Sequence, residues 1–451
     1  MLKSPLFWKS VTPVGVMLLL LIPLMMVRAM INERADYRSE VENAIRQSTS
    51  GPQKIVGPLV AIPVTERYTV LENDKEIQRK RSFIHFWLPE TLLVEGNQQV
   101  EERNIGVYTG QVWNTGVAIK ATFDAARLNL LDKPNVSLGK PFIVVAVGDA
   151  RGIGAVNVLK VNGITLAAEP GSGLADGEEG IHFPLPDSGW ATRSLDLAMS
   201  LDLNGTGSFS VVPVGRSSEL FLFSNWPHPG FLGDVLPVHR EVSESGFQAR
   251  WRSNWFANNL GSRFADARKV NWRTLPAFSA AVVTPADSYQ LTDRAIKYAV
   301  LLIALSFVSL FVFEIRAQRQ LHPVQYLLIG LSLVMFYLLL LALSEYIGFT
   351  KAWIAASLVG ALLNGVYLQA VLKGWRNSIL FTLALLALDG VMWCLLRSEE
   401  SSLLPGTGVL LLSLGGVMYL TRHLDWYSLS RPRTKPAASQ RNQEEALRLW
   451  K

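Results

Sequence analysis

Aromatic and imidazole side chains that could contact a ligand are gathered in one proline-rich string, residues 224–237. Within it Trp226, His228 and Phe231 are interspersed with prolines, which restrict a turn to few conformations. Aromatic rings presented on a stiff turn can stack against sugars or peptides. The same rings can instead close the end of a β-sandwich, and this structural role is the commoner one. We predict Trp226, His228 and Phe231 as binding candidates beside that structural alternative.

Four polar side chains lie within or beside strongly apolar segments: Glu345, Asn364, Gln369 and Asp389. Polar and ionisable groups inside a membrane are costly and are functional candidates by default. Asp389 is the strongest of the four, because it lies in the middle of an apolar window. It could relay protons, or it could hydrogen-bond Asn364 or Gln369 across helices, as polar membrane residues often do.

Motifs of known catalytic chemistry do not occur in the sequence. It contains no G-x-S-x-G, no H-E-x-x-H and no Walker A motif. The near match at Gly152 and Gly154 lacks the third glycine of a dinucleotide fingerprint and predicts a turn. The single cysteine, Cys394, excludes an intrachain disulfide and cysteine-rich zinc sites. We therefore predict no enzyme activity, no catalytic residue, no metal and no cofactor.

Apolar residues are concentrated in six windows. The first, residues 11–27, follows Lys3 and Lys9 and is long for a cleaved signal peptide, so we predict an uncleaved signal anchor. Five windows lie in the last third of the chain: 298–313, 326–343, 353–372, 379–396 and 403–420. Each approaches the roughly 20 residues that cross a bilayer as a helix. Five such runs in succession make buried helices of a soluble protein improbable, and six transmembrane helices are predicted.

The charges predict how these helices are oriented. Residues 31–295 carry 26 Lys and Arg against 29 Asp and Glu, a net charge of −3. The rest of the chain carries 17 against 8, a net charge of +9, so the overall +6 belongs to the membrane flanks rather than to a nucleic-acid surface. Basic residues favour the cytoplasmic loops. Both termini are thus predicted to be cytoplasmic, with residues 31–296 on the opposite side of the membrane.

The long segment between the first two windows favours β-structure. After a helical continuation to about residue 47, short alternating runs are separated by Gly, Pro, Asn and Asp, a pattern typical of a sandwich or barrel. The predicted strands are 55–64, 82–88, 104–108, 116–123, 142–147, 157–161, 194–203, 208–214 and 219–224. One enlarged sandwich and two stacked ones both fit the length.

The predicted fold class is an α-helical multi-pass membrane protein with six transmembrane helices and a large, mainly-β, sandwich-like periplasmic domain. The predicted divisions are a cytoplasmic N-terminus (1–10), a transmembrane signal anchor (11–30), the β-rich domain (31–296), a five-helix transmembrane bundle (297–421) and a basic cytoplasmic tail (422–451). The tail's cations are expected to contact anionic lipid.

Several strings resemble the inner membrane protein CreD family of Gram-negative bacteria over nearly the whole length. They are 51–58 (GPQKIVGP), 103–108 (RNIGVY), 148–153 (GDARGI), 224–237, 247–251 (FQARW), 297–298 (KY), 322–326 (HPVQY) and 343–349 (LSEYIGF). Thr49 stands where members often have Trp, and Tyr346 where they often have His. The resemblance implies a link to the CreBC two-component regulon, colicin tolerance and envelope integrity, and no established enzyme activity.

Three functions remain open from the sequence. The leading one is a non-enzymatic envelope protein whose periplasmic domain binds an envelope protein or glycan while its helices contact the lipid bilayer. The second is a small-solute or proton-coupled transporter whose path is lined by Asn364, Gln369 and Asp389. The third is an enzyme that modifies cell-wall or lipid-linked glycan through a pair of carboxylates.

Overall fold

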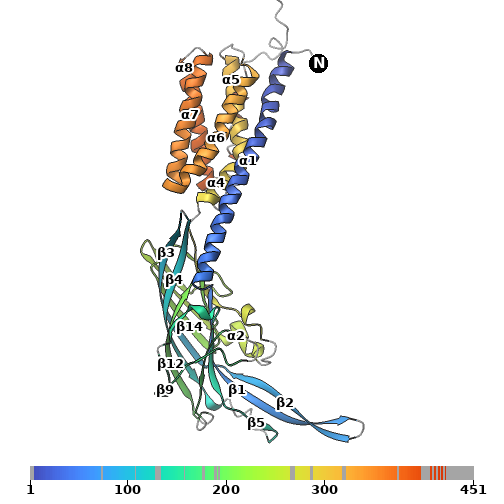
Figure 1. Cartoon of the computed structure of the whole chain (residues 1–451), viewed down its shortest axis with the longest axis vertical. Coiled ribbons are helices and arrows are strands. Elements are labelled where there is room, and N and C mark those ends of the chain that lie inside the picture. The colour runs from blue at the N-terminus through green and yellow to red at the C-terminus, as the bar shows by residue number, and fades with distance from the viewer. Residues whose placement is uncertain are drawn as a thin grey trace, which may run out of the picture. The chain divides into compact units, whose positions relative to one another are not determined.

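The computed structural model describes residues 5–397 except for short gaps, together with a few positions between 407 and 422. The gaps are 73–74, 107, 127–133, 157, 175–177, 187–189, 191–192, 265–269, 285–287, 317–320 and 373–374. The chain divides into a helical unit, residues 1–37 with 286–451, and a β unit, residues 38–285 (Figure 1). Most of the apolar window 403–420 and nearly all of the basic tail lie outside the described residues.

A single long helix begins the described chain. Helix α1 covers Pro5–Ser48, so the predicted anchor and its helical continuation are one element. It contains Pro13 and Pro23, and each proline removes one backbone hydrogen bond of the helix. The helix ends where Thr49 donates its backbone N–H to the carbonyl of Ile45 at 3.0 Å, just before the Gly51–Pro52 pair that cannot continue it.

The helical unit contains five further helices among the described residues. They are α4 (Ser288–Lys297), α5 (Ala299–Arg316), α6 (Pro323–Ile347), α7 (Phe349–Leu372) and α8 (Trp375–Arg397). Among the described residues four helices, including α1, are long and apolar enough to cross a membrane. The pair α4 and α5, bent by 46°, adds a fifth if it forms one span. Six spans are therefore not confirmed, because the last predicted window lies largely outside the described residues.

Small residues bring these helices close together. A Cβ atom on Gly330 of α6 would lie 2.1 Å from Cδ1 of Leu20 on α1, and one on Gly365 of α7 would lie 2.3 Å from Oγ1 of Thr382 on α8. Side chains larger than glycine would separate the helices at both crossings. Small residues at such contacts are typical of membrane helix packing, where close van der Waals approach replaces a hydrophobic driving force.

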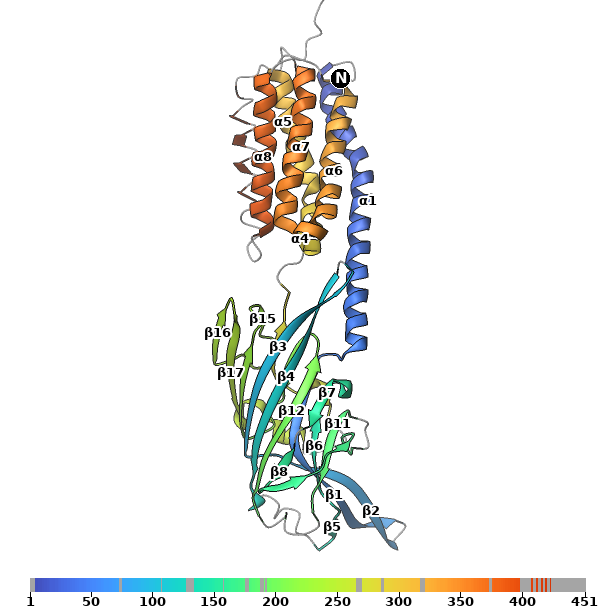
Figure 2. The ribbon, with the colours of Figure 1, turned by 60° about the vertical axis from the view of Figure 1, so that its left-hand side comes forward.

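The β unit contains two nine-stranded sheets (Figure 2). The first has the order β10-β11-β6-β1-β13-β18-β15, with β2 and β5 also paired to β1. Its strands are β1 (Gln53–Glu72), β2 (Lys75–Trp87), β5 (Val136–Leu138), β6 (Phe142–Ala146), β10 (Glu169–Pro170), β11 (Gly180–Pro184), β13 (Ser208–Val211), β15 (Pro229–Gly230) and β18 (Phe278–Val282). The outer part of the β1–β2 hairpin extends away from the sandwich as a two-stranded ribbon (Figure 2).

The second sheet has the order β16-β17-β14-β3-β4-β12-β8-β9, with β7 also paired to β12. Its strands are β3 (Thr91–Ile105), β4 (Tyr108–Phe123), β7 (Ile153–Val156), β8 (Leu159–Val161), β9 (Ile164–Leu166), β12 (Leu195–Gly205), β14 (Ser217–Ser224), β16 (His239–Ser243) and β17 (Gly246–Asn254). Burial alternates along β12 and β14, as expected when one face of a sheet meets the core and the other meets solvent.

One hydrophobic core joins the two sheets. Trp113 of β4 packs edge-to-face on Phe209 of β13 at 5.8 Å, and Trp251 of β17 stacks on Phe278 of β18 at 6.4 Å. Between the two sequence possibilities, the structure therefore has a single enlarged sandwich. The short helices α2 (Trp255–Asn258) and α3 (Leu260–Arg263) follow β17 and help to cover one margin of this core, into which Leu260 is buried.

Candidate functional site

The proline-rich string, residues 224–237, has two parts with different surroundings. In the first part, Trp226 donates its indole N–H to the carbonyl of Val283 at 3.0 Å and lies edge-to-face with His228 at 6.2 Å. Phe231 packs edge-to-face on Phe247 at 5.6 Å and on Trp251 of the core. These contacts hold the turn against the margin of the sandwich. Of the three predicted binding candidates, only His228 is exposed.

The second part of the string borders a cavity on the β unit. This charged pocket has a volume of about 640 Å³ and contains four charged side chains, Glu219, Asp234, Arg252 and Arg263. Val235 and Val238 also line it. Strands β14 and β17 position Glu219 and Arg252, which lie directly opposite each other in the antiparallel ladder. The pocket thus joins the end of the string to the outer, solvent-facing side of the second sheet.

Large apolar side chains stand in solvent beside the charged pocket. Phe256 is 96% exposed, Val238 72% and Leu236 65%. Val238 lines the pocket, Leu236 lies two residues before it in the chain, and Phe256 directly precedes the lining residue Ala257. We call these three residues the apolar rim. Exposed apolar side chains that gather around a polar site are typical of surfaces that bind another molecule.

An ion-pair network spans the outer face of the second sheet. Glu219 accepts from Arg250 at 2.8 Å and lies 2.7 Å from Arg252. The hydrogen bond from Arg250 lowers the pKa of Glu219. Glu219 and Asp234 are two carboxylates in one pocket, as glycoside chemistry requires, but a general acid needs a raised pKa. The lowered pKa disqualifies Glu219 from that role.

A second polar cluster, which we call the joint, connects the end of α1 to both sheets. Gly51 donates its backbone N–H to Asp149 at 2.9 Å, and the Gln53 amide donates to the Asp149 carbonyl at 2.9 Å. Arg151 pairs with Asp149 at 2.7 Å and donates to the carbonyl of Gln47 at 2.8 Å, near the C-terminus of α1. A cation there stabilises the free carbonyls of a helix end.

The electrostatics of the joint favour the ionised carboxylate. The Arg151 guanidinium, followed by the backbone N–H of Gly51, lowers the pKa of Asp149 to about 2. Gly152 lies so close to the neighbouring chain that a Cβ atom would stand 2.1 Å from the Gln53 amide and 2.3 Å from the Asn204 carbonyl. The joint is therefore a densely satisfied structural element. Sequence reasoning noticed its strings only as family motifs, because Gly51, Asp149 and Asn204 are far apart in the chain.

The predicted intramembrane residues have separate partners. Glu345 lies 3.7 Å from Arg34 of α1, and Asn364 accepts from the Ser332 hydroxyl at 2.8 Å. Gln369 is exposed on α7. Asp389 is buried, and its backbone carbonyl accepts from the Trp353 indole at 3.2 Å. No hydrogen bond between Asp389 and either Asn364 or Gln369 occurs in the part of the chain that the structure describes.

One buried acid in the helical unit was not among the candidates. Glu314, near the end of α5, accepts from the Tyr326 hydroxyl of α6 at 2.8 Å, and both residues are buried. The sequence placed Glu314 in the loop after the window 298–313, because a hydropathy window ends at its first acid. The available signal for its burial was its hydrogen-bond partner Tyr326, which lies three residues after Pro323 at the start of α6.

The described histidines of the β unit lie apart from one another. His85 is half-buried, and burial lowers its pKa. His182 lies 3.2 Å from Glu169, while His228 and His239 are exposed. Among the described residues no three His, Cys, Asp or Glu side chains are grouped as metal ligands.

Taken together, the apolar helices and the separate β unit define a multi-pass membrane protein that carries a large β-sandwich. The family model for the inner membrane protein CreD matches residues 5–427. The inner membrane protein CreD of Escherichia coli (strain K12) is 65% identical over 451 residues, which is the full length of both chains. The chain therefore belongs to the CreD family of multi-pass inner-membrane proteins.

One solved structure shows a remote similarity. A structure from Legionella pneumophila, described as that of a nutrient binding protein, covers 49% of this chain and 77% of its own, with 8% identity and a TM-score of 0.28. A similarity this low carries no argument about function.

Proposed function

We propose that this protein supports the integrity of the bacterial cell envelope without catalysing a reaction. In this account the helices anchor it in the inner membrane, both termini are cytoplasmic, and the β unit binds an envelope component in the periplasm. The distribution of charge supports that orientation, because the β segment has a net charge of −3 while the segments that flank it have a net charge of +9. A role in the CreBC stress response and in colicin tolerance is the setting that the family suggests.

The observation that carries this proposal is the charged pocket with its apolar rim. Phe256, Leu236 and Val238 expose large apolar surfaces, whereas Trp113, Trp251 and Phe278 of the same unit are buried in its core. Groups of large exposed apolar side chains often mark a surface that is covered in a complex. The four charged groups of the pocket would then select a partner protein by charge complementarity.

Complementation tests the proposal in cells. Escherichia coli lacking its 65% identical relative would carry either the parent chain or a double variant, Leu236→Asp with Phe256→Asp, and survival under a cell-wall antibiotic would be measured. We expect the parent to restore survival and the double variant to fail at equal membrane abundance. Ile164→Asp is the matched control, because Ile164 is 61% exposed on β9 and lines none of these features. Equal survival with the double variant and the parent would refute the proposal.

Proton-coupled transport is the second candidate, and one observation favours it. Asp389 is buried in the helical unit, and the hydroxyl of Tyr337 is buried without a hydrogen-bond partner among the described residues. Unsatisfied groups inside a membrane protein are costly, so they are often retained for a function. If Asp389 relays protons, Asp389→Asn abolishes complementation while Ser344→Ala, which removes a hydroxyl that donates to the Leu341 carbonyl of its own helix, preserves it. Full complementation by Asp389→Asn would remove this candidate.

A further inference from the structure

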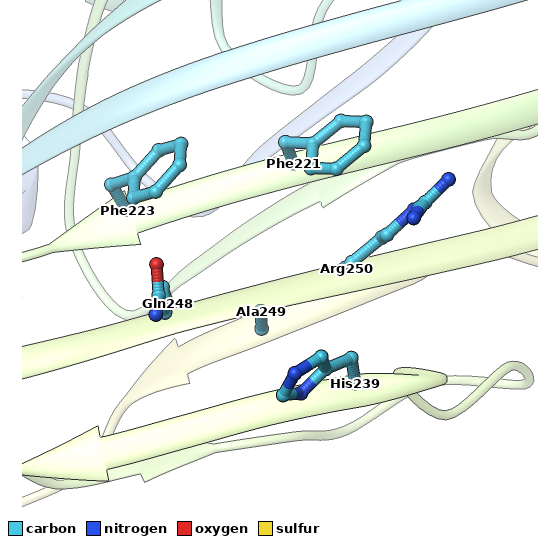
Figure 3. Close-up of a pocket in the computed structure, with 6 residues that line it drawn as sticks. All are labelled: Phe221, Phe223, His239, Gln248, Ala249 and Arg250. Carbon is cyan, nitrogen blue, oxygen red and sulfur yellow. The ribbon is translucent and has the colours of Figure 1, made fainter.

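The outer face of the second sheet contains a shallow groove that neither the charged pocket nor the joint uses. Phe221 and Phe223 of β14, Gln248 and Arg250 of β17, and His239 of β16 line a cavity of about 230 Å³, which we call the aromatic groove. Figure 3 shows these five side chains on the same side of three neighbouring strands. None of them belongs to the core cluster.

Strand register explains why these residues meet. Phe221 lies opposite Arg250, which lies opposite His239, and Phe223 lies opposite Gln248, which lies opposite Glu241. Residues directly opposed in an antiparallel sheet project to the same face. The groove therefore has two rows across the strands, and each row has an aromatic ring at one end and polar groups at the other.

The two rings of the groove are not equivalent. The guanidinium of Arg250 lies 4.8 Å from the ring centre of Phe221 and covers it. Phe223 is 48% exposed, and in the part of the chain that the structure describes no ring or cation packs on it. A large aromatic ring left open on a sheet face offers a flat apolar surface to a ligand.

The polar groups beside Phe223 are held in place by one another. The Gln248 amide donates to Glu241, and Glu241 lies 3.6 Å from His239. Together an amide, a carboxylate and an imidazole supply both donors and acceptors within reach of one ring. Because these side chains are already oriented, a ligand would lose less free energy in ordering them.

The charges of the groove argue against an anionic ligand. Arg250, its cation, is already paired with Glu219 at 2.8 Å, and Glu241 adds a negative charge at the opposite wall. A phosphate or carboxylate would compete with Glu219 and meet Glu241. A neutral ligand with many hydroxyl groups meets neither obstacle.

An extended peptide is also disfavoured. It would add a strand beside β16, which is the outermost strand of its sheet. That strand has five residues, and His239, Arg240 and Glu241 place charged or polar groups along it. Short, charged edge strands are the usual protection against strand addition.

We propose that the aromatic groove binds a neutral pyranose ring of a glycan chain. The apolar C–H face of the sugar stacks on Phe223, and its hydroxyl or acetamido groups hydrogen-bond to Gln248, Glu241 and His239. The volume suits one ring rather than a larger ligand, since pockets for drug-sized ligands start at about 300 Å³. This inference needs no protein partner, so it stands or falls independently of the apolar rim.

Calorimetry on the full chain in detergent tests the inference with two defined probes, the tetramer of N-acetylglucosamine and cellotetraose. We expect at least one of them to bind saturably and Phe223→Ala to weaken that binding at least tenfold. Ile164→Ala is the matched control and should bind like the parent, because it removes a large exposed apolar side chain from β9 of the same sheet, outside the groove. Gln248→Leu should also weaken binding. Because Gln248 is exposed, this substitution should leave the fold intact, so weaker binding would report the loss of a ligand contact.

Three results would overturn the inference. They are the absence of binding by either tetrasaccharide, binding that Phe223→Ala leaves unchanged, and binding of an extended pentapeptide that displaces the sugar and depends on Phe223. Equal survival with the rim double variant and with the parent chain, while sugar binding depends on Phe223, would refute the proposed function alone.

Discussion

The joint and the apolar rim belong to the same β unit and differ in how their side chains are paired and packed. In the joint, Asp149, Arg151 and Gln53 engage one another and the backbone, and Gly152 leaves no space for a larger residue. At the rim, Phe256 and Leu236 remain in solvent. The contrast teaches where stability and recognition reside, because satisfied buried groups stabilise the fold while exposed apolar groups are available to a partner.

The largest stability effect is expected at the centre of the joint. Gly152→Ala places a methyl group against the Asn204 carbonyl, and overpacking of this kind costs about 3 kcal/mol. Urea unfolding followed by tryptophan fluorescence of the full chain in detergent measures the loss. Gly116→Ala is the control, because its nearest neighbour would be 3.6 Å away, and we expect a change within about 0.5 kcal/mol. Equal losses would contradict the packing argument.

Removing the charge of the joint should have the next effect. Asp149→Asn weakens the hydrogen bonds to Arg151 and Gly51 and should cost about 2 kcal/mol at neutral pH. The folded pKa, about 2, lies below the ordinary value of 3.8, so the ionised carboxylate stabilises the fold above pH 4. That contribution is lost as the pH falls from 3.8 towards 2. The difference between parent and variant should therefore shrink over this window, and a constant difference would contradict the assignment.

A smaller effect is expected for a polar contact between membrane helices. Asn364→Leu removes the hydrogen bond from Ser332, and such contacts contribute about 0.6 kcal/mol on average. Because the contact joins α6 to α7, thermal unfolding in detergent should report it. A loss of several kcal/mol would show that the helical unit depends on its polar contacts as strongly as the joint does.

The smallest effect on stability is expected at the rim. Leu236→Asp should change the free energy of unfolding by less than about 0.5 kcal/mol, because the side chain is already in solvent. The same urea experiment measures it. A large loss would mean that the rim is part of the packed structure, and the contrast with the joint would disappear.

Local sequence patterns predicted many of the helices and strands. Features that depend on pairing between distant segments were harder to predict. The apolar run at residues 11–27 and the helical pattern that continues to about residue 47 predicted helix α1. The alternation of residues 116–123 indicated strand β4. The predicted separate strand at 104–108 was wrong, because Ile105 and Tyr108 are the last pair of the β3–β4 hairpin. Strand β17 was missed although Phe247, Ala249 and Trp251 alternate with polar residues.

The binding candidates at residues 224–237 stay a prediction, and the structure adds the contacts that their side chains make. The string 224–237 does reach a surface cavity, but Trp226 and Phe231 mainly hold its turn, whereas Val238 lies just beyond the string. No spacing in the sequence could indicate Glu219, Arg252 and Asp234 as one pocket. The approach of Glu219 and Arg252, which are 33 residues apart, depends on the antiparallel pairing of β14 with β17.

Site-specific photo-crosslinking in living cells tests the central claim most directly. A photoreactive residue would replace Leu236, Phe256 or, as the control of similar exposure, Ile164, and captured proteins would be identified by mass spectrometry. The account predicts that Leu236 and Phe256 capture the same single envelope protein and that Ile164 does not. Capture of that protein from all three positions, or only of lipid from the two rim positions, would contradict it.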